Sequence, residues 1–257
     1  MVRVCFALAA AFCGAAMGVT PSYSAASIVN SGNFAAGPLA PNSIATIFGT
    51  GLSRSAQQLS PSDIVAGQLP VELNYTQVFV DNFPAPLFYV SDTQINFLIP
   101  SKQALGPCKI RVATQGNSGP EATVTIVDAA PALFPLPGGY AIATHVDNSL
   151  VTADLPAHPG EIVVVYAIGL GKTSPNPATG ELPKYAAPLV NLGTLQVSLA
   201  GKVLDAGLVK YAGLTPQSAG LYQLNIEIPG DSDQDPEIRV SLAGQSSPTG
   251  LKLAVTR

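Results

Sequence analysis

The stretch APLFYVSDTQINFLIP, Ala85–Pro100, ends in a pattern that returns later in the chain as QLNIEIP, Gln223–Pro229. In both places Gln and Asn stand two residues apart, and apolar residues occupy the positions between and after them. This alternation has the two-residue period of a half-buried strand, and the closing proline ends such a strand. We therefore expect two equivalent strands, one in each half of the chain.

Three further pairs of motifs recur in the same order in the two halves. They are PNSIATIFGTGL (41–52) with PGEIVVVYAIGL (159–170), TQVFVDN (76–82) with LQVSLAG (195–201), and IRVATQGNSGP (110–120) with IRVSLAGQSSP (238–248). Four matched anchors predict an internal duplication, with copies at 27–128 and 129–257.

The composition favours an all-β fold. Gly 24 and Pro 23 are high counts, charged residues make up only 11%, and the 47% apolar fraction is enough for a core in each copy. Short runs rich in Val, Ile, Thr and Phe lie between turn residues, as in β-sandwiches. We predict two tandem immunoglobulin-like β-sandwich domains, with strands near 43–49, 76–80, 86–90, 94–99, 108–114, 122–127, 161–167, 194–199, 202–205, 208–212, 221–228, 237–243 and 250–255.

Turns and loops can also be placed. Asp81-Asn82 and Ala200-Gly201 stand where a two-residue hairpin should turn. Segments 53–70 and 171–190 are long, polar and rich in proline, and loops of this length are uncommon unless they pack on themselves or bind something. An apolar or aromatic patch on these loops would favour a binding function.

The N-terminus resembles a secretory signal. Arg3 precedes an apolar run, and Ser24 and Ala26 occupy the minus-three and minus-one positions of a cleavage site. We expect removal of residues 1–26, no membrane span in the mature chain, and a secreted, periplasmic or cell-surface location. A formal charge of −4 and a pI near 5.0 argue against a nucleic-acid partner.

No cofactor, metal or catalytic site is predicted. Cys108 would be the only cysteine left after signal removal, and a buried structural thiol is the favoured interpretation. His145 with Asp147, and His158, lack the partners of a metal site or a hydrolase. The Gly-Lys-Thr of 171–173 lacks the spacing of a phosphate-binding loop. Asp231, Asp233 and Asp235 resemble the start of a calcium loop, but we interpret them as a solvated hairpin tip without calcium dependence.

Aromatic residues offer another candidate surface, because sugars stack on exposed rings. The chain has no tryptophan, and we expect most of its strand aromatics to be core: Phe83, Phe88, Tyr89, Tyr140, Tyr166, Tyr185, Tyr211 and Tyr222.

The repeated amides are the remaining candidates. Gln94 and Asn96 project from one face of their strand, as do Gln223 and Asn225. Our hypothesis is that Asn96 and Asn225 are buried and hold adjacent loops, since an amide can satisfy unpaired loop groups. The alternative is that these four residues form paired sites that grip a repeating polymer.

Long segments of the chain also resemble a known family. IVNSGNFAAGPLAPNSIATIFGTGL (28–52), VFVDNFPAPLFYVSDTQINFLIP (78–100), HPGEIVVVYAIGLGKTSPNPATGELP (158–183) and VSLAGKVLDAGLVKYAGLTPQSAGLYQLNIEIP (197–229) look like the C-terminal domain of many secreted acidobacterial proteins. The resemblance covers nearly all of the mature chain. It implies IPT/TIG-like, immunoglobulin-like repeats and an exported location, and it carries over no catalytic residues.

These observations lead to one favoured function and two alternatives. We expect a secreted, non-catalytic binding or cell-surface interaction module whose partner is a surface polysaccharide or protein. A structural spacer or stabilising cap that binds nothing is the first alternative. A glycan-active hydrolase that uses two carboxylates in one cleft is the second.

Overall fold

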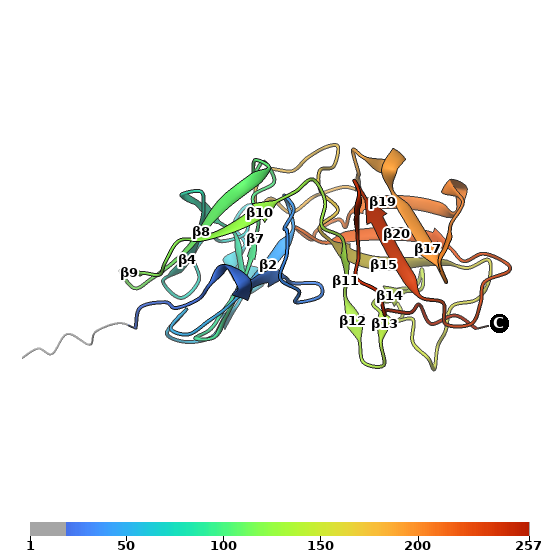
Figure 1. Cartoon of the computed structure of the whole chain (residues 1–257), viewed down its shortest axis with the longest axis horizontal. Helices are drawn as coiled ribbons and strands as arrows, with labels where there is room; N and C mark the ends of the chain where they lie inside the picture. Colours follow the sequence, from blue (N-terminus) through green and yellow to red (C-terminus); the bar gives the residue numbers. More distant parts are fainter. Residues whose placement is uncertain (1–18, 257) are drawn as a thin grey trace, which may run out of the picture.

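The structure is a computed structural model that describes residues 19–256. Two lobes lie side by side along the longest axis (Figure 1). One hydrophobic core gathers residues between Ile28 and Ile126, and a second gathers residues between Ala129 and Val255. The residues of 1–26 that precede Val19 lie outside the described part of the chain.

The first lobe consists of two antiparallel sheets over its core. One sheet has the order β1 (Ile28–Asn30), β2 (Ile44–Phe48), β7 (Gln94–Leu98), β6 (Leu87–Val90), β3 (Gln57–Gln58). The other has the order β10 (Ala122–Ile126), β8 (Gly106–Thr114), β4 (Thr76–Val80), β5 (Phe83–Ala85), and β9 (Asn117–Ser118) pairs with β8.

The second lobe has a matching arrangement. One sheet has the order β11 (Ala132–Leu133), β15 (Ile162–Ile168), β20 (Tyr222–Glu227), β19 (Val209–Leu214), β16 (Ala187–Pro188), with β14 (Ala143–Thr144) on β15. The other has the order β18 (Lys202–Val203), β17 (Gln196–Leu199), β21 (Ile238–Leu242), β22 (Gln245–Ser246). β12 (Pro135–Leu136) and β13 (Tyr140–Ala141) form a small separate pair.

The prediction of an all-β protein is confirmed. The described residues contain no α-helix, and their four 3-10 turns are η1 (Ala25–Ser27), η2 (Pro61–Asp63), η3 (Leu192–Thr194) and η4 (Ala206–Leu208). Both predicted hairpin turns are present: Asp81 and Asn82 have φ of 46° and 69°, and Ala200 and Gly201 have 49° and 79°. Such left-handed pairs match the twist of two-residue hairpins.

The predicted strand at 250–255 was wrong. Lys252 forms bridges with Tyr140 and Glu237, whereas Val255 forms one with Ala157. Because the partners change from residue to residue, this segment forms no continuous ladder.

The central strands of the two lobes, β7 and β20, pair with their neighbours in the same way, and the pairing shifts at the same place in both sheets. β7 pairs Asn96 with Tyr89, and β20 pairs Asn225 with Tyr211. In both sheets the register shifts next to that tyrosine, between Leu87 and Tyr89 and between Val209 and Tyr211. A bulge of this kind turns two successive residues of one strand toward the same face.

The two long loops dock the lobes together. Segments 53–70 and 171–190 meet through backbone hydrogen bonds from Leu69 to Gly180 and from Leu182 to Gly67, both 2.9 Å long. A third apolar cluster fills the same seam and combines residues of both lobes: Leu69, Leu98 and Ala219, with Ile44, Leu59, Ile64, Phe88 and Leu182 packed against them. The loops therefore bury each other.

Polar contacts complete the seam. The buried hydroxyl of Ser101, after β7, donates to the Pro177 carbonyl at 2.9 Å. Tyr222 is fully buried, and its hydroxyl donates to the Gly171 carbonyl and accepts from Asn42 Nδ2 of the first lobe at 3.3 Å. Burial raises the pKa of Tyr222, so the phenol stays protonated and keeps this donor.

We predict that Tyr222→Phe destabilises the protein. The substitution keeps the ring but leaves a buried carbonyl without its donor, which costs about 1–3 kcal/mol. The melting temperature should fall by several degrees in a scanning calorimetry experiment. The control is Tyr75→Phe, whose side chain is 72% exposed and should melt like the parent. Equal melting of both variants would contradict this role of Tyr222.

Candidate functional site

The outer face of the first sheet is divided into an apolar and a polar part. Along β7, Ile95 and Phe97 point into the core, while Gln94, Asn96 and Leu98 point outward. Leu98 is fully buried because the docked loops cover it. Gln94 and Asn96 are half-buried and remain on the uncovered part of the face.

A chain of hydrogen bonds fixes the polar part. The Asn96 Oδ1 atom accepts from Thr46 Oγ1 at 3.0 Å and from Gln94 Nε2 at 2.9 Å. The Ser31 hydroxyl lies 2.7 Å from that of Thr46. Since Oδ1 receives two donors, the amide group of Asn96 has a single orientation, and its Nδ2 hydrogens point away from these partners.

Aromatic rings flank the amides. Phe48 is the cross-strand partner of Gln94, and Tyr89 is that of Asn96. Phe34 lies beside Phe48 with ring centroids 5.9 Å apart and an interplanar angle of 52°. The two phenyl side chains are 54% and 38% exposed. We call Phe34, Phe48, Tyr89, Gln94 and Asn96 the amide platform.

Phe34 reaches its place through an unusual backbone. Its φ of 53° lies in the left-handed region, which is rare for a bulky residue and marks sites where the surroundings impose the conformation. The Phe34 N–H donates to the Asn30 carbonyl at 2.8 Å, and this closes the turn that carries the ring. The turn thus sets the backbone position from which the exposed ring projects.

The platform offers defined chemistry to a ligand. Within the described residues, no protein group bonds to the Nδ2 hydrogens of Asn96 or to the Oε1 atom of Gln94. Two donors and one acceptor therefore lie beside exposed rings. A ring provides apolar surface for stacking, and an amide pair can bond to neighbouring hydroxyl groups.

The second lobe carries the corresponding residues. Gln223 Nε2 donates to Asn225 Oδ1 at 3.0 Å, and their cross-strand partners are Tyr166 and Tyr211. The flanking rings are less open here, because Tyr166 and Tyr211 are half-buried whereas Phe34 and Phe48 are exposed. The Tyr211 hydroxyl donates to the Leu214 carbonyl and accepts from the Ala187 N–H. The first lobe therefore presents the better candidate site.

The loop-holding hypothesis for Asn96 and Asn225 was wrong. Both side chains are half-buried, and each accepts from the glutamine two residues earlier on its own strand. The reason is that each asparagine oxygen bonds within its own sheet, while the loops satisfy their backbone groups across the lobe seam. Phe34 and Phe48 were not identified from the sequence as candidate site residues, although Phe48 stands at an outward position of the predicted strand 43–49.

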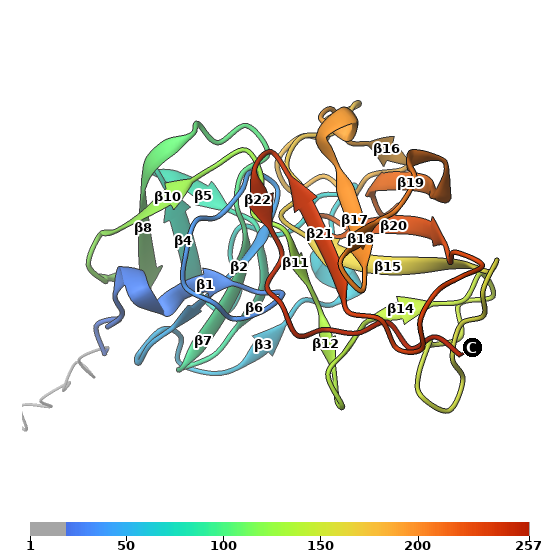
Figure 2. The ribbon, with the colours of Figure 1, turned by 45° about the vertical axis from the view of Figure 1, so that its right-hand side comes forward.

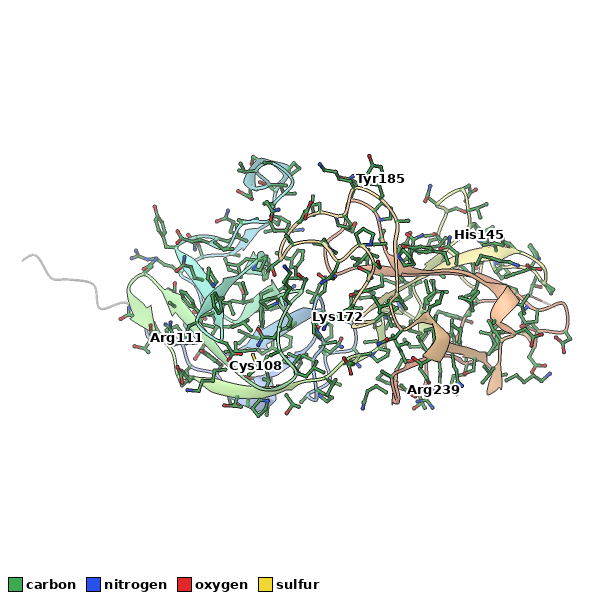
Figure 3. The ribbon with its side chains drawn as sticks, turned by 90° about the horizontal axis from the view of Figure 1, so that it is seen from above. Cys108, Arg111, His145, Lys172, Tyr185 and Arg239 are labelled. Atoms are coloured by element: carbon green, nitrogen blue, oxygen red, sulfur yellow. The ribbon has the colours of Figure 1, made fainter. Side chains whose placement is uncertain are left out.

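Two hollows lie on either side of the docked loops. Asp81, Phe83, Lys102 and Gln103 line an open one of about 550 Å³ together with Thr179 of the second lobe. A smaller one of about 230 Å³ is lined by loop residues that include Pro175, Glu181 and Tyr185. Tyr185 is 80% exposed at the edge of the loops, and Lys172 lies between the lobes (Figure 3).

A third hollow lies at the border of the lobes, where β22 approaches the first lobe (Figure 2). Its volume is about 200 Å³, and Asn33 and Pro38 face Gln245 and Ser246 across it. No exposed aromatic side chain lines it, so it lacks the ring that the amide platform presents.

His145 has the geometry of a structural residue. Its Nδ1 atom bonds to Glu161 Oε1, and its Nε2 atom lies 3.3 Å from the Leu155 carbonyl. The Glu161 carboxylate raises the pKa of His145, and the second oxygen of Glu161 accepts from the His158 N–H. Because both ring nitrogens are occupied, His145 has no nitrogen free to act as a base.

The acidic segment 231–235 also has local partners. Asp235 accepts from the Tyr140 hydroxyl and the Val255 N–H, each at 3.2 Å, and Asp231 pairs with Lys202 at 3.6 Å. Within residues 19–256, no group of three or more His, Cys, Asp or Glu side chains could hold a metal ion. The absence of calcium dependence stays a prediction.

Cys108 is buried, as predicted. Burial, aided by the nearby Asp81 carboxylate, raises the pKa of its thiol to about 12. A thiol of this kind is a poor nucleophile at neutral pH.

No family model matches the chain, and no functionally curated protein matches its sequence. Within the described residues, no helix has the length and apolar character that a membrane crossing requires.

Several solved structures are similar to the chain at a low level. SGBP-B of the Bacteroides ovatus mixed-linkage glucan utilization locus, in complex with a mixed-linkage heptasaccharide, is 12% identical with a TM-score of 0.32, and the match covers 85% of this chain and 42% of that one. The surface glycan-binding protein PbSGBP-B from Prevotella bryantii is 13% identical with a TM-score of 0.28, over 90% and 41% of the two chains. Domains 5-6 of the S-layer protein SbsC are 10% identical with a TM-score of 0.28, over 92% and 98%. The chain thus spans about two fifths of the first two proteins.

We predict that His145 makes stability depend on pH. A raised folded pKa means that protonated His145 stabilises the fold fully below its unfolded pKa near 6.5, and that this contribution is lost as the pH rises through the folded value. The free energy of unfolding, measured with urea at pH 5.5 and at pH 8.5, should therefore fall more between these two pH values for the parent than for His145→Gln. The control, His158→Gln, changes an exposed side chain and should keep the parent's pH dependence. Identical pH dependence in the parent and His145→Gln would refute this.

Proposed function

We propose that the chain is an exported, non-catalytic module that binds polysaccharide through the amide platform of its first lobe. The proposal includes secretion to the periplasm, the medium or the cell surface. It also includes two tandem immunoglobulin-like sandwiches, at 27–128 and 129–257, that arose by duplication.

The observation that carries this proposal is that unsatisfied amide groups lie beside exposed rings. Phe34 and Phe48 present ring surface to solvent, and the free hydrogens of Asn96 lie on the same face of the sheet. A sugar ring has an apolar C–H face and neighbouring hydroxyl groups. Such a ring can stack on the phenyl groups while its hydroxyls bond to Asn96 and Gln94.

The charge of the platform favours a neutral sugar. None of its five residues is Asp, Glu, His, Lys or Arg, and Thr46 and Ser31 beneath them carry neutral hydroxyl groups. A uronic acid or a phosphate would find no cation among them to replace its lost water. We therefore expect neutral glycans to bind more tightly than charged ones.

The duplication is supported by details that the fold does not require. Both central strands carry the same Gln-to-Asn hydrogen bond, at 2.9 and 3.0 Å, and both pair this asparagine with a tyrosine next to a register shift. Independent sandwiches need not share either feature.

The non-catalytic part of the proposal is supported by the occupied histidine. His145, whose pKa is raised, uses both ring nitrogens within its own loop, and the His158 side chain stands exposed on a turn. General acid-base catalysis needs a group within reach of the substrate. The amide platform itself contains no carboxylate or histidine.

The binding test uses affinity gel electrophoresis against neutral polysaccharides: mixed-linkage β-glucan, xyloglucan, mannan and starch. At least one should retard the parent protein. Phe48→Ala should weaken that retardation about tenfold or more, because covering a phenyl ring stabilises by about 1.5–3 kcal/mol. Asn96→Ala should weaken it several-fold through lost hydrogen bonds.

The matched control is Phe83→Ala, which removes a ring that is 72% exposed on the other sheet of the same lobe. It should bind like the parent. If no polysaccharide retards the parent, the spacer alternative holds. If Phe83→Ala loses binding and Phe48→Ala keeps it, the hollow beside Phe83 is the site. Release of reducing ends by the parent would show that the module is an enzyme.

A further inference from the structure

Residues 19–27, most of which the predicted signal removal would take away, are built into the first lobe. Pro21 is buried. Ser22 pairs with Thr50 through two backbone hydrogen bonds, from Ser22 N to Thr50 O at 2.9 Å and from Thr50 N to Ser22 O at 3.0 Å. This segment therefore pairs with the chain just after β2 and is part of the domain.

Tyr23 fastens the same segment to the second sheet. Its hydroxyl donates to the Pro120 carbonyl at 2.6 Å and accepts from the Val112 N–H of β8 at 2.7 Å. Its ring packs against the first core. Without Tyr23, the Val112 N–H and the Pro120 carbonyl would lose these partners.

Glycines make room for this segment on the surface below it. A Cβ atom added at Gly49 would lie 2.4 Å from the Ser22 carbonyl oxygen, and one at Gly119 would lie 2.7 Å from the Tyr23 ring. Neither glycine has the positive φ that would demand glycine for backbone reasons. Their lack of a side chain is explained by the close approach of Ser22 and Tyr23.

We propose that the exported chain keeps these residues and that its leader is cut at the Gly18–Val19 bond. This inference rests on the predicted leader, but it replaces the predicted cut after Ala26. Gly18 and Ala16 place small residues at the minus-one and minus-three positions, as leader cleavage requires. A leader peptidase would hydrolyse the bond with one water molecule, leaving a carboxylate on Gly18 and an amino group on Val19.

The direct test is the mass of the exported protein. The full chain, 1–257, is expressed in a bacterium with an export pathway, and the product is characterised by intact mass and N-terminal sequencing. The expected N-terminus is Val19. Any other N-terminus overturns the assigned bond, and one at Ser27 also overturns the structural role of the segment.

A second test separates that role from the export step. Chains 19–257 and 27–257, produced without a leader, should differ by several degrees in melting temperature, and Tyr23→Phe in the longer chain should lie between them. Gly119→Ala should lower the melting temperature of 19–257 but leave that of 27–257 unchanged, since the three atoms nearest to the added methyl group all belong to Pro21 and Tyr23. Equal melting of the two parents, or an equal effect of Gly119→Ala in both, overturns the inference.

Discussion

The docking of segment 53–70 against segment 171–190 is the interaction on which the rest of the structure depends. Two backbone hydrogen bonds, Leu69 to Gly180 and Leu182 to Gly67, join loops from different lobes, and an apolar cluster around Leu98 fills the space beneath them. Loops of this length would otherwise expose many unpaired backbone groups. By pairing with each other they satisfy these groups and hold the lobes together. They also cover the apolar part of the first sheet's outer face and leave its amide part open.

This constraint explains where a ligand can bind. The loops were the natural place to look for a binding surface, yet four of their large apolar side chains are used in the seam: Leu59, Ile64, Leu69 and Leu182. What remains open is a face with two phenyl rings, inclined at 52° to each other, and an ordered amide pair. Under the proposed function, an open platform of this kind suits one stretch of a long chain better than a small molecule, which needs a concavity to cover most of its surface. The related but less open face around Asn225 would allow the same polymer a second, weaker contact.

Local features of the fold could be predicted from the sequence because they depend on neighbours along the chain. The alternation around Ile95 and Phe97 predicts a strand, and Asp81-Asn82 predicts a hairpin whatever surrounds them. The seam could not be predicted, since Leu69 and Gly180 are brought together only by the packing of whole lobes. The roles of Asn96 and Asn225 were misjudged for a different reason, because each asparagine accepts from the glutamine two residues earlier on its own strand instead of from a loop. The hydrogen bond between Gln94 and Asn96 requires only that the two residues are two apart on one strand. The contact between the rings of Phe34 and Phe48 depends on a turn in which Phe34 has a positive φ, and no simple sequence pattern predicts that turn.

Amide hydrogen exchange, followed by NMR on the chain from Val19 to Arg257, tests the docking of the loops most directly. The N–H groups of Leu69 and Leu182 are bonded across the seam, so they should exchange about as slowly as those of the central strands β7 and β20. Their protection should disappear together in a variant such as Leu69→Ala, which removes part of the apolar cluster. If both amides exchange at the rate of open loops while β7 and β20 stay protected, loop docking does not hold the two lobes together, and its place as the central constraint of the structure is contradicted.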